Sequence, residues 1–182
     1  MKSTMMASVL GAVLLGTVGL AGCSRQIENA VAELEAAPGE EWTMRVLGDD
    51  ADRVFLVVGP DGKHVGARLK GGASTLLEDA EAMALIGKSS LVSEEPPPEK
   101  LSITTPGATI KIGADEEGNG DRGRVQISAG GVDINVAGDS TGGDSGEVAI
   151  QGVNATAAGK FIDDIEELSP EVKQKMREKL GL

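Results

Sequence analysis

The sequence predicts an α+β protein, and three observations support this prediction. Residues 41–92 alternate apolar and polar side chains around a strong turn signal and then change to helical spacing. Residues 101–158 are rich in glycine and contain a weak internal repeat. Residues 159–182 have two short apolar stripes at helical spacing. We therefore expect a small β-hairpin and helix unit, a glycine-rich β-repeat region and a C-terminal amphipathic helical hairpin.

The first unit is predicted to contain three strands. Alternation over residues 42–47 indicates one strand, and the continuous apolar run Val54–Val58 indicates a buried second strand. The segment Gly59-Pro60-Asp61-Gly62 is a strong turn signal, because proline presets φ and glycine accepts positive φ. Alternation over residues 65–70 then completes a β-hairpin with one apolar face.

A helix is expected after the Gly71-Gly72 break. Thr75 and Glu78 fit a capping box at its start, and Gly87 fits the C-terminal cap. We expect this helix to lie across the sheet. Its predicted apolar face consists of Leu76, Leu77, Ala80, Met83 and Ala84.

A linker is predicted at residues 93–100, because its three consecutive prolines favour an extended polyproline II spacer. We place a domain boundary there. The predicted organisation is a signal peptide at 1–22, a tether at 23–40, an α+β unit at 41–92, the linker at 93–100, a β-repeat region at 101–158 and helices at 159–182.

The repeat has the form strand, tight turn, strand. Residues 103–112 align with residues 127–136, and a degenerate third copy begins at Ile150 with Asn154 at the glycine position. The pattern resembles stacked hairpins or a short β-solenoid, such as those in bacterial surface and putative adhesin proteins. A low-complexity, partly disordered segment is the alternative interpretation.

The C-terminal residues predict two helices. Ser169 is the expected N-cap of the second helix, with Pro170 at its first position and Gly181 after its end. We expect the pair to dock on its own domain, and dimerisation and partner binding are the alternatives. The two apolar stripes are Phe161, Ile162, Ile165 and Leu168, then Val172, Met176 and Leu180.

Composition argues against several classes of function. The chain has 29 acidic and 17 basic side chains and a net charge of -12, so it is a poor nucleic-acid binder, since phosphate contacts need clustered Lys and Arg. Its aromatic residues are Trp42, Phe55 and Phe161 alone, which argues against a sugar or nucleotide site.

The sequence assigns no catalytic residue, no metal site and no cofactor. His64 is the only histidine, and the alternation places it on a polar face without a nucleophile motif nearby. Two acidic loops supply oxygen ligands of the kind that calcium prefers, but neither matches the spacing of an EF-hand or of a nonapeptide calcium repeat, and solvated turns explain them equally well. Their residues are Asp115, Glu116, Glu117, Asn119 and Asp121, then Asp139, Asp144 and Glu147.

The N-terminus reads as a secretory signal that ends at a cysteine. Lys2 supplies a positive charge, an apolar stretch follows, and Leu20-Ala21-Gly22-Cys23 resembles the lipobox of bacterial lipoproteins. Cys23 is the only cysteine of the chain. The resemblance implies that diacylglycerol is attached to the Cys23 thiol and that the chain is cut before Cys23. Ser24, where an aspartate would favour the inner membrane, implies the outer membrane.

These observations predict a non-enzymatic lipoprotein of the bacterial envelope with a structural or interaction role. Its expected partners are membrane lipid, through acylated Cys23, and an envelope protein, and its expected place is the outer membrane, facing the periplasm. One alternative is a module that binds calcium or a cell-surface partner through the β-repeat region. Another is an enzyme that uses two carboxylates alone.

Overall fold

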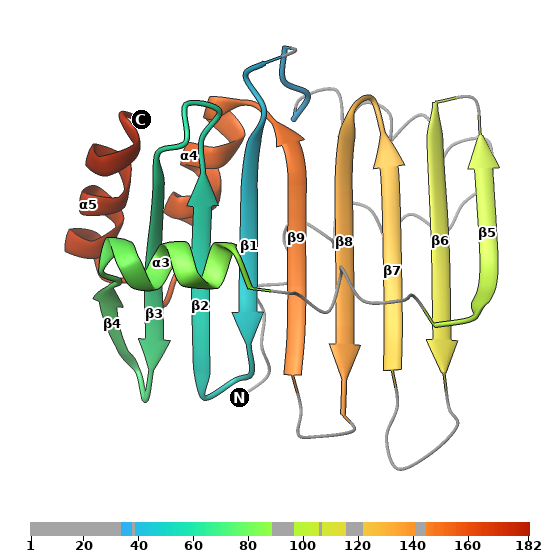
Figure 1. Ribbon diagram of the computed structural model, residues 1–182, viewed down its shortest axis with the longest axis horizontal. Coiled ribbons are helices and arrows are strands. Elements are labelled where there is room, and N and C mark those ends of the chain that lie inside the picture. Colours follow the sequence, from blue (N-terminus) through green and yellow to red (C-terminus); the bar gives the residue numbers. More distant parts are fainter. Residues whose placement is uncertain (1–33, 38, 89–96, 106, 116–121, 141–144) are drawn as a thin grey trace.

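The described residues build one antiparallel sheet of nine strands, with helices on both of its faces (Figure 1). The computed structural model describes residues 34–37, 39–88, 97–105, 107–115, 122–140 and 145–182. The strands are β1 (Trp42–Gly48), β2 (Asp52–Val58), β3 (His64–Lys70), β4 (Ala73–Leu76), β5 (Glu99–Thr105), β6 (Ala108–Asp115), β7 (Arg122–Ala129), β8 (Val132–Asp139) and β9 (Ser145–Val153). The helices are α3 (Asp79–Ile86), α4 (Ala155–Asp164) and α5 (Pro170–Leu180).

The strand order is β4-β3-β2-β1-β9-β8-β7-β6-β5, so the first and last strands lie together at the centre. From β1 the chain runs strand by strand to the β4 edge, crosses the sheet with α3, and returns from the β5 edge to β9 (Figure 1). The predicted fold class is therefore wrong. Strands from both sides of the predicted linker 93–100 belong to one open sheet, because β1 pairs with β9.

The predicted repeat forms hairpins, but they are not stacked. The first copy becomes β5 and β6, in which Ile103 pairs with Ile110, and the second becomes β7 and β8. These hairpins lie side by side because β6 also pairs with β7 along its whole length. The third copy is not a hairpin, since β9 ends at Val153 and a helix follows. The side chain of the next residue, Asn154, accepts a hydrogen bond from the Ala157 amide at 2.8 Å and caps α4.

The predicted hairpin of the first unit is confirmed, because β2 and β3 pair on either side of the turn at 59–63. The next segment differs from the prediction. Thr75 lies in β4, and α3 starts after Glu78 without a side-chain cap, so the capping box is wrong. The predicted apolar face is wrong too: Met83 is 55% exposed, whereas Ala82 packs against the sheet beside Val54 and Leu56. The cap at Gly87 is confirmed.

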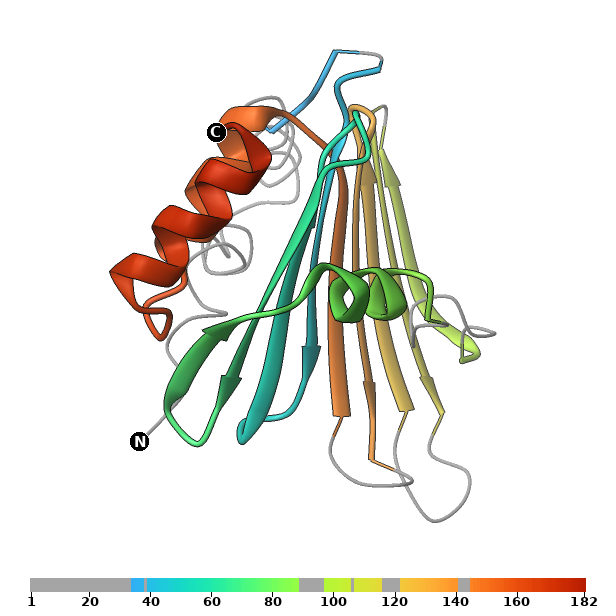
Figure 2. The same cartoon turned by 60° about the vertical axis from the view of Figure 1, so that its left-hand side comes forward.

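The C-terminal helices pack on the face opposite to α3, over the half of the sheet that contains β1 to β4 (Figure 2). The Ser169 hydroxyl accepts a hydrogen bond from the Val172 amide, and Gly181 ends α5 in the left-handed conformation, as predicted. Helix α4 begins at Ala155, four residues before the predicted range. Docking on the protein's own domain is confirmed by the buried residues Ile162, Ile165, Leu168, Val172, Met176 and Leu180.

Candidate functional site

Two rows of aliphatic side chains cross the sheet on the face that α4 and α5 partly cover. Residues paired in antiparallel strands share a face, so the register gives each row directly. We call them the aliphatic rows. The first runs Ile103, Ile110, Ile127, Ile134, Ile150 and Met44, and the second runs Leu101, Ile112, Val125, Val136, Val148 and Val46.

Helices α4 and α5 cover the aliphatic rows at one end of the sheet and not at the other. Helix α4 contacts β1, and α5 contacts β3 and β4, which places both helices over one half (Figures 1 and 2). Met44 is accordingly buried in the main core. At the other end Leu101 and Ile103 are 48% and 41% exposed. Among the described residues, no helix lies over β5 to β8 on this face (Figure 2).

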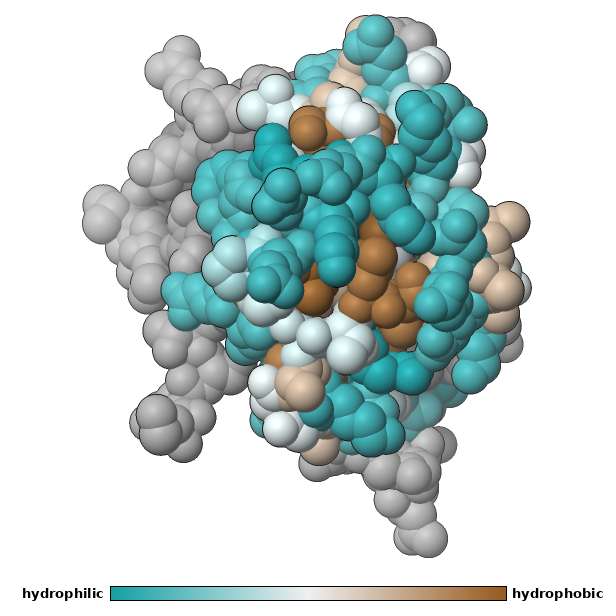
Figure 3. All heavy atoms as spheres, turned by 90° about the vertical axis from the view of Figure 1, so that its left-hand side faces the viewer, coloured by the Kyte–Doolittle hydropathy of each residue, from teal (hydrophilic) through white to brown (hydrophobic). Residues whose placement is uncertain are grey.

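The two edges of the sheet also differ. At the β4 edge, the Ser74 hydroxyl accepts a hydrogen bond from the Ser169 amide at 3.0 Å. Around the same edge, Lys179 of α5 lies 2.6 Å from Asp79 of α3, so elements from opposite faces meet there. Figure 3 looks onto this side, which is largely hydrophilic around a central hydrophobic recess. Among the described residues, no comparable contact covers the β5 edge.

Only the first half of β5 has features that discourage pairing with a further strand. Glu99 and Lys100 place charges there, and the register with β6 shifts between Glu99 and Leu101. Charged residues and bulges are the usual means by which proteins protect a sheet edge. Residues 102–105 have neither feature and pair only with β6 in the described structure. This half of β5, with Ile103 on the aliphatic face, is therefore the most accessible edge of the sheet.

The opposite face holds a buried ion pair that sequence reasoning missed. Arg45 of β1 lies 2.9 Å from Glu147 of β9, and their side chains are only 12% and 2% exposed. Arg45 also donates to the carbonyls of Leu85 and Ile86 at the end of α3, where a positive charge is favourable. Glu147, a predicted calcium ligand, is thus a structural partner of Arg45. Only the strand pairing reveals this, because no local motif links the two residues.

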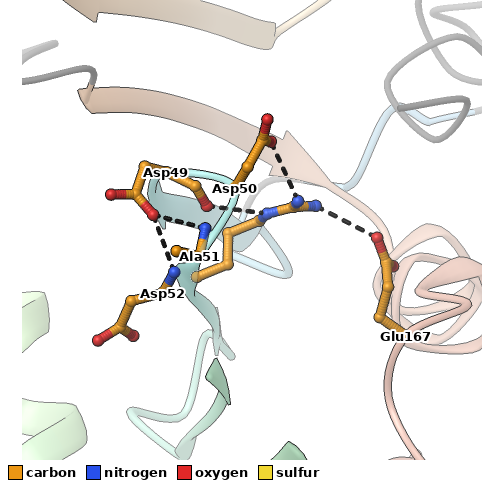
Figure 4. Close-up of polar contacts among 6 residues, drawn as sticks. Asp49, Asp50, Ala51, Asp52 and Glu167 are labelled. Carbon is orange, nitrogen blue, oxygen red and sulfur yellow. Dashed lines mark hydrogen bonds and ion pairs between the residues drawn. The ribbon is translucent and has the colours of Figure 1, made fainter. Parts of the chain in front are cut away.

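The β1–β2 turn concentrates acidic side chains (Figure 4). The Asp49 carboxylate accepts hydrogen bonds from the amides of Ala51 and Asp52 at 2.7 and 2.8 Å, and these bonds lower the pKa of Asp49. Arg53 lies within 3.4 Å of Asp50 and 3.2 Å of Glu167. These carboxylates therefore stabilise the turn and join it to the connection between α4 and α5.

An open recess lies at this end of the sheet, with a volume of about 430 Å³. Four neighbouring strands each contribute a glycine to its lining, so no side chain covers the backbone at these positions. Asp139, which also lines the recess, forms an ion pair with Arg122 at 3.8 Å. No cluster of three side chains suited to a metal occurs among the described residues. The recess is lined by Gly48, Asp49, Asp50, Gly123, Gly138, Asp139, Ser140, Ser145 and Gly146.

The remaining predicted ligands of the acidic loops are not placed. Residues 116–121 and Asp144 lie outside the described part of the chain, as does the side chain of Asp115. His64 starts β3, and its Nδ1 lies 3.2 Å from the Gly62 carbonyl oxygen, within its own turn. The calcium alternative therefore stays a prediction.

The predicted lipidation residue, Cys23, also lies outside the described residues. None of the described helices has the length and apolar character needed to cross a membrane. The sequence matches no model of a known protein family and no curated protein.

Proposed function

We propose that this protein is a lipid-anchored, non-enzymatic interaction protein of the bacterial envelope, and that it recognises a protein partner through the β5 edge. The observation that supports the proposal best is the exposure of Leu101 and Ile103 on the edge strand β5. Residues 102–105 of this strand pair on one side only. An extended segment of a partner adds to such an edge through main-chain hydrogen bonds, and alternate side chains give specificity.

The anchor in this proposal is acylated Cys23. Multiple acyl chains give stable attachment, because each buried methylene contributes about 0.8 kcal/mol and one chain alone binds only marginally. The acidic body would not by itself be attracted to an anionic lipid surface. We expect Cys23→Ala to abolish lipid labelling and to release the protein from the membrane or leave it unprocessed. Unchanged labelling and membrane retention of this variant would refute the anchor.

The partner surface can be tested in intact cells with a photo-crosslinking amino acid at position 103. We expect a specific adduct with an envelope protein at this position. The matched control is the same amino acid at position 83 on α3, because Met83 is also an exposed apolar residue but lies on the opposite face. Ile103→Lys, combined with the crosslinker at position 101, is expected to abolish the adduct.

Two results would contradict the β5 proposal. Equal adducts from positions 83 and 103 would mean that the contact is nonspecific. An adduct that survives Ile103→Lys would mean that the edge residues do not determine recognition.

A further inference from the structure

Strand β5, at the outer edge of the sheet, uses the backbone of alternate residues to bond to β6 (Figure 1). Strand β6 is regular along its length, and its Ala114 amide donates to the Pro98 carbonyl at 3.2 Å. Every second residue of β6 before Ala114 therefore also directs its backbone groups to β5. The β5 partners of these residues include Leu101 and Ile103, whose amide and carbonyl groups are thus occupied within the sheet.

Ser102 and Thr104 are the positions at which a further strand can bond to β5. Their amide and carbonyl groups point away from β6, because residues of an antiparallel pair alternate in this respect. Both residues are exposed, and their side chains lie on the face opposite to that of Ile103. The open edge therefore presents two polar side chains on one face and an apolar side chain between them on the other.

This short segment is complementary to itself. When two copies of β5 run antiparallel with Ile103 at a two-fold axis, Ser102 of each copy lies opposite Thr104 of the other. Each such pair exchanges both of its main-chain hydrogen bonds, and the facing hydroxyls add to the pairing. Ile103 then meets Ile103 of the second copy at a non-hydrogen-bonded position, where facing side chains are closest. The first aliphatic row continues in this way from one copy to the next.

Charge also favours this register. The chain has a net charge of -12, so two copies repel each other unless they meet where the surface is uncharged. Residues 101–105 contain no charged side chain, whereas Glu99, Lys100 and the register shift beside them lie outside the contact. A two-fold axis at Ser102 would instead bring Lys100 and the shifted register into the ladder, and both features discourage pairing.

We propose that the partner recognised through the β5 edge is a second copy of this chain, and that two sheets join edge to edge about a two-fold axis at Ile103. This inference rests on the proposed function and names its partner. The interface is isologous, as in most homodimers. The contact is short and therefore weak, and the proposed lipid anchor compensates by confining both copies to one membrane surface at a high effective concentration.

Cysteine crosslinking of the full-length protein in isolated membranes tests the register. Ile103→Cys places two thiols opposite each other, within reach of a disulfide on mild oxidation. Leu101→Cys is the matched control, because the two side chains share a strand and a face and are 48% and 41% exposed for Leu101 and Ile103. In the dimer, however, position 101 lies about 13 Å along the strands from its counterpart, too far for a disulfide.

We expect Ile103→Cys to give about tenfold more disulfide-linked dimer than Leu101→Cys, because a disulfide forms only between facing positions. Dilution of the membranes in detergent before oxidation should abolish this difference, since the anchor no longer concentrates the copies. The parent chain, without an added cysteine, measures any dimer that forms through Cys23 itself.

A second comparison tests whether main-chain hydrogen bonds hold the two copies together. Thr104→Pro removes an amide that points to the open edge and takes no hydrogen bond from β6, whereas Thr104→Ala keeps this amide. In the Ile103→Cys background, we expect Thr104→Pro to lower crosslinking to the level of Leu101→Cys and Thr104→Ala to preserve it. An unchanged melting temperature of both variants in dilute detergent shows that the fold is intact.

The contrary outcomes separate this inference from the proposed function. If Ile103→Cys gives no dimer while the photo-crosslinker at position 103 captures a different protein, self-pairing is wrong and recognition through β5 stands. If neither forms an adduct, both are wrong. Equal dimer from positions 101 and 103 would indicate random collision, and a dimer that survives Thr104→Pro would exclude strand pairing. A dimer that forms only between a Leu101→Cys copy and an Ile103→Cys copy would exclude the axis at Ile103.

Discussion

Arg45 and Glu147 form a residue-scale link between the two halves of the chain. Each is almost fully buried, and Arg45 also satisfies carbonyls at the end of α3. Neither charge has much water near it, so each depends on the other. Removing one partner of a buried pair typically costs more than the pair itself contributes, because a charge is left uncompensated.

We therefore expect Glu147→Gln to lower the free energy of unfolding by about 3–5 kcal/mol, the usual cost of breaking a buried pair. Urea unfolding followed by circular dichroism measures it. Glu167→Gln is the matched control, because its contact with Arg53 is more exposed, and we expect it to cost at most about 1 kcal/mol. Equal effects of the two substitutions would show that burial of the Arg45 pair is unimportant.

Asp49 predicts how the protein responds to acid. Backbone hydrogen bonds lower its pKa in the folded chain below the ordinary value of 3.8. The unfolded chain therefore binds more protons at acidic pH, so the stabilisation from Asp49 is present above 3.8 and is lost as the pH falls through the folded-state pKa. We expect Asp49→Asn to weaken the loss of melting temperature on acidification, because the amide oxygen still accepts both bonds without titrating.

The control for this measurement is Asp50→Asn, which makes the same change in net charge in the same turn. Melting temperatures of the three proteins are compared from neutral pH to below 3.8. An identical acid dependence in the wild type and Asp49→Asn would contradict the assigned role of Asp49.

At the scale of single elements, local signals predict some turns and caps correctly, although the capping box of Thr75 and Glu78 is wrong. The turn at residues 59–62, the N-cap Ser169 and the C-cap Gly181 were all identified correctly, because each depends on residues within a few positions. The apolar face of α3 was not. Met83 fits a helical stripe by spacing, but α3 has only one buried residue, Ala82, and its orientation is set by the sheet below it and by Arg45.

Helix α5 gives a prediction at this scale. Met176 is fully buried against the core, so we expect Met176→Ala to lower the free energy of unfolding by about 2–5 kcal/mol, as large-to-small core substitutions do. The loss should be the same at two protein concentrations, because the helix docks within its own chain. Lys175→Ala, at an exposed neighbouring position, should change stability by less than about 0.5 kcal/mol. A loss that depends on concentration would instead indicate self-association.

At the scale of the whole molecule, the predicted fold class failed because the decisive contact is not local. Nothing within residues 42–48 specifies that β9, rather than another alternating strand, is the partner of β1. The hairpins of residues 103–112 and 127–136 were visible in the sequence, but a stacked and a coplanar arrangement bury the same alternating face. The open β5 edge and the aliphatic rows follow from that coplanar arrangement, so they could not be predicted either.

One continuous sheet predicts one unfolding transition. Calorimetry of the full-length protein should give a single peak whose calorimetric and van't Hoff enthalpies agree, because β1–β9 pairing and the Arg45–Glu147 pair join both halves. Two resolved peaks would show that the regions before and after residues 93–100 unfold independently. Proteolysis within residues 93–100 that leaves one half stably folded would likewise show that the two regions are independent.

The central position of β1 and β9 also determines the order in which the sheet can form. Arg45 and Glu147 are 102 residues apart in the chain, so the centre of the sheet cannot close until almost the entire polypeptide has been synthesised. Each four- or five-strand meander can pair locally, but closing the long loop between them is entropically costly and slow. Until then, β1 and β9 each have one unpaired edge, and these two edges later pair at the centre of the sheet. The proposed envelope location, which requires export of an unfolded chain, would fit this delay.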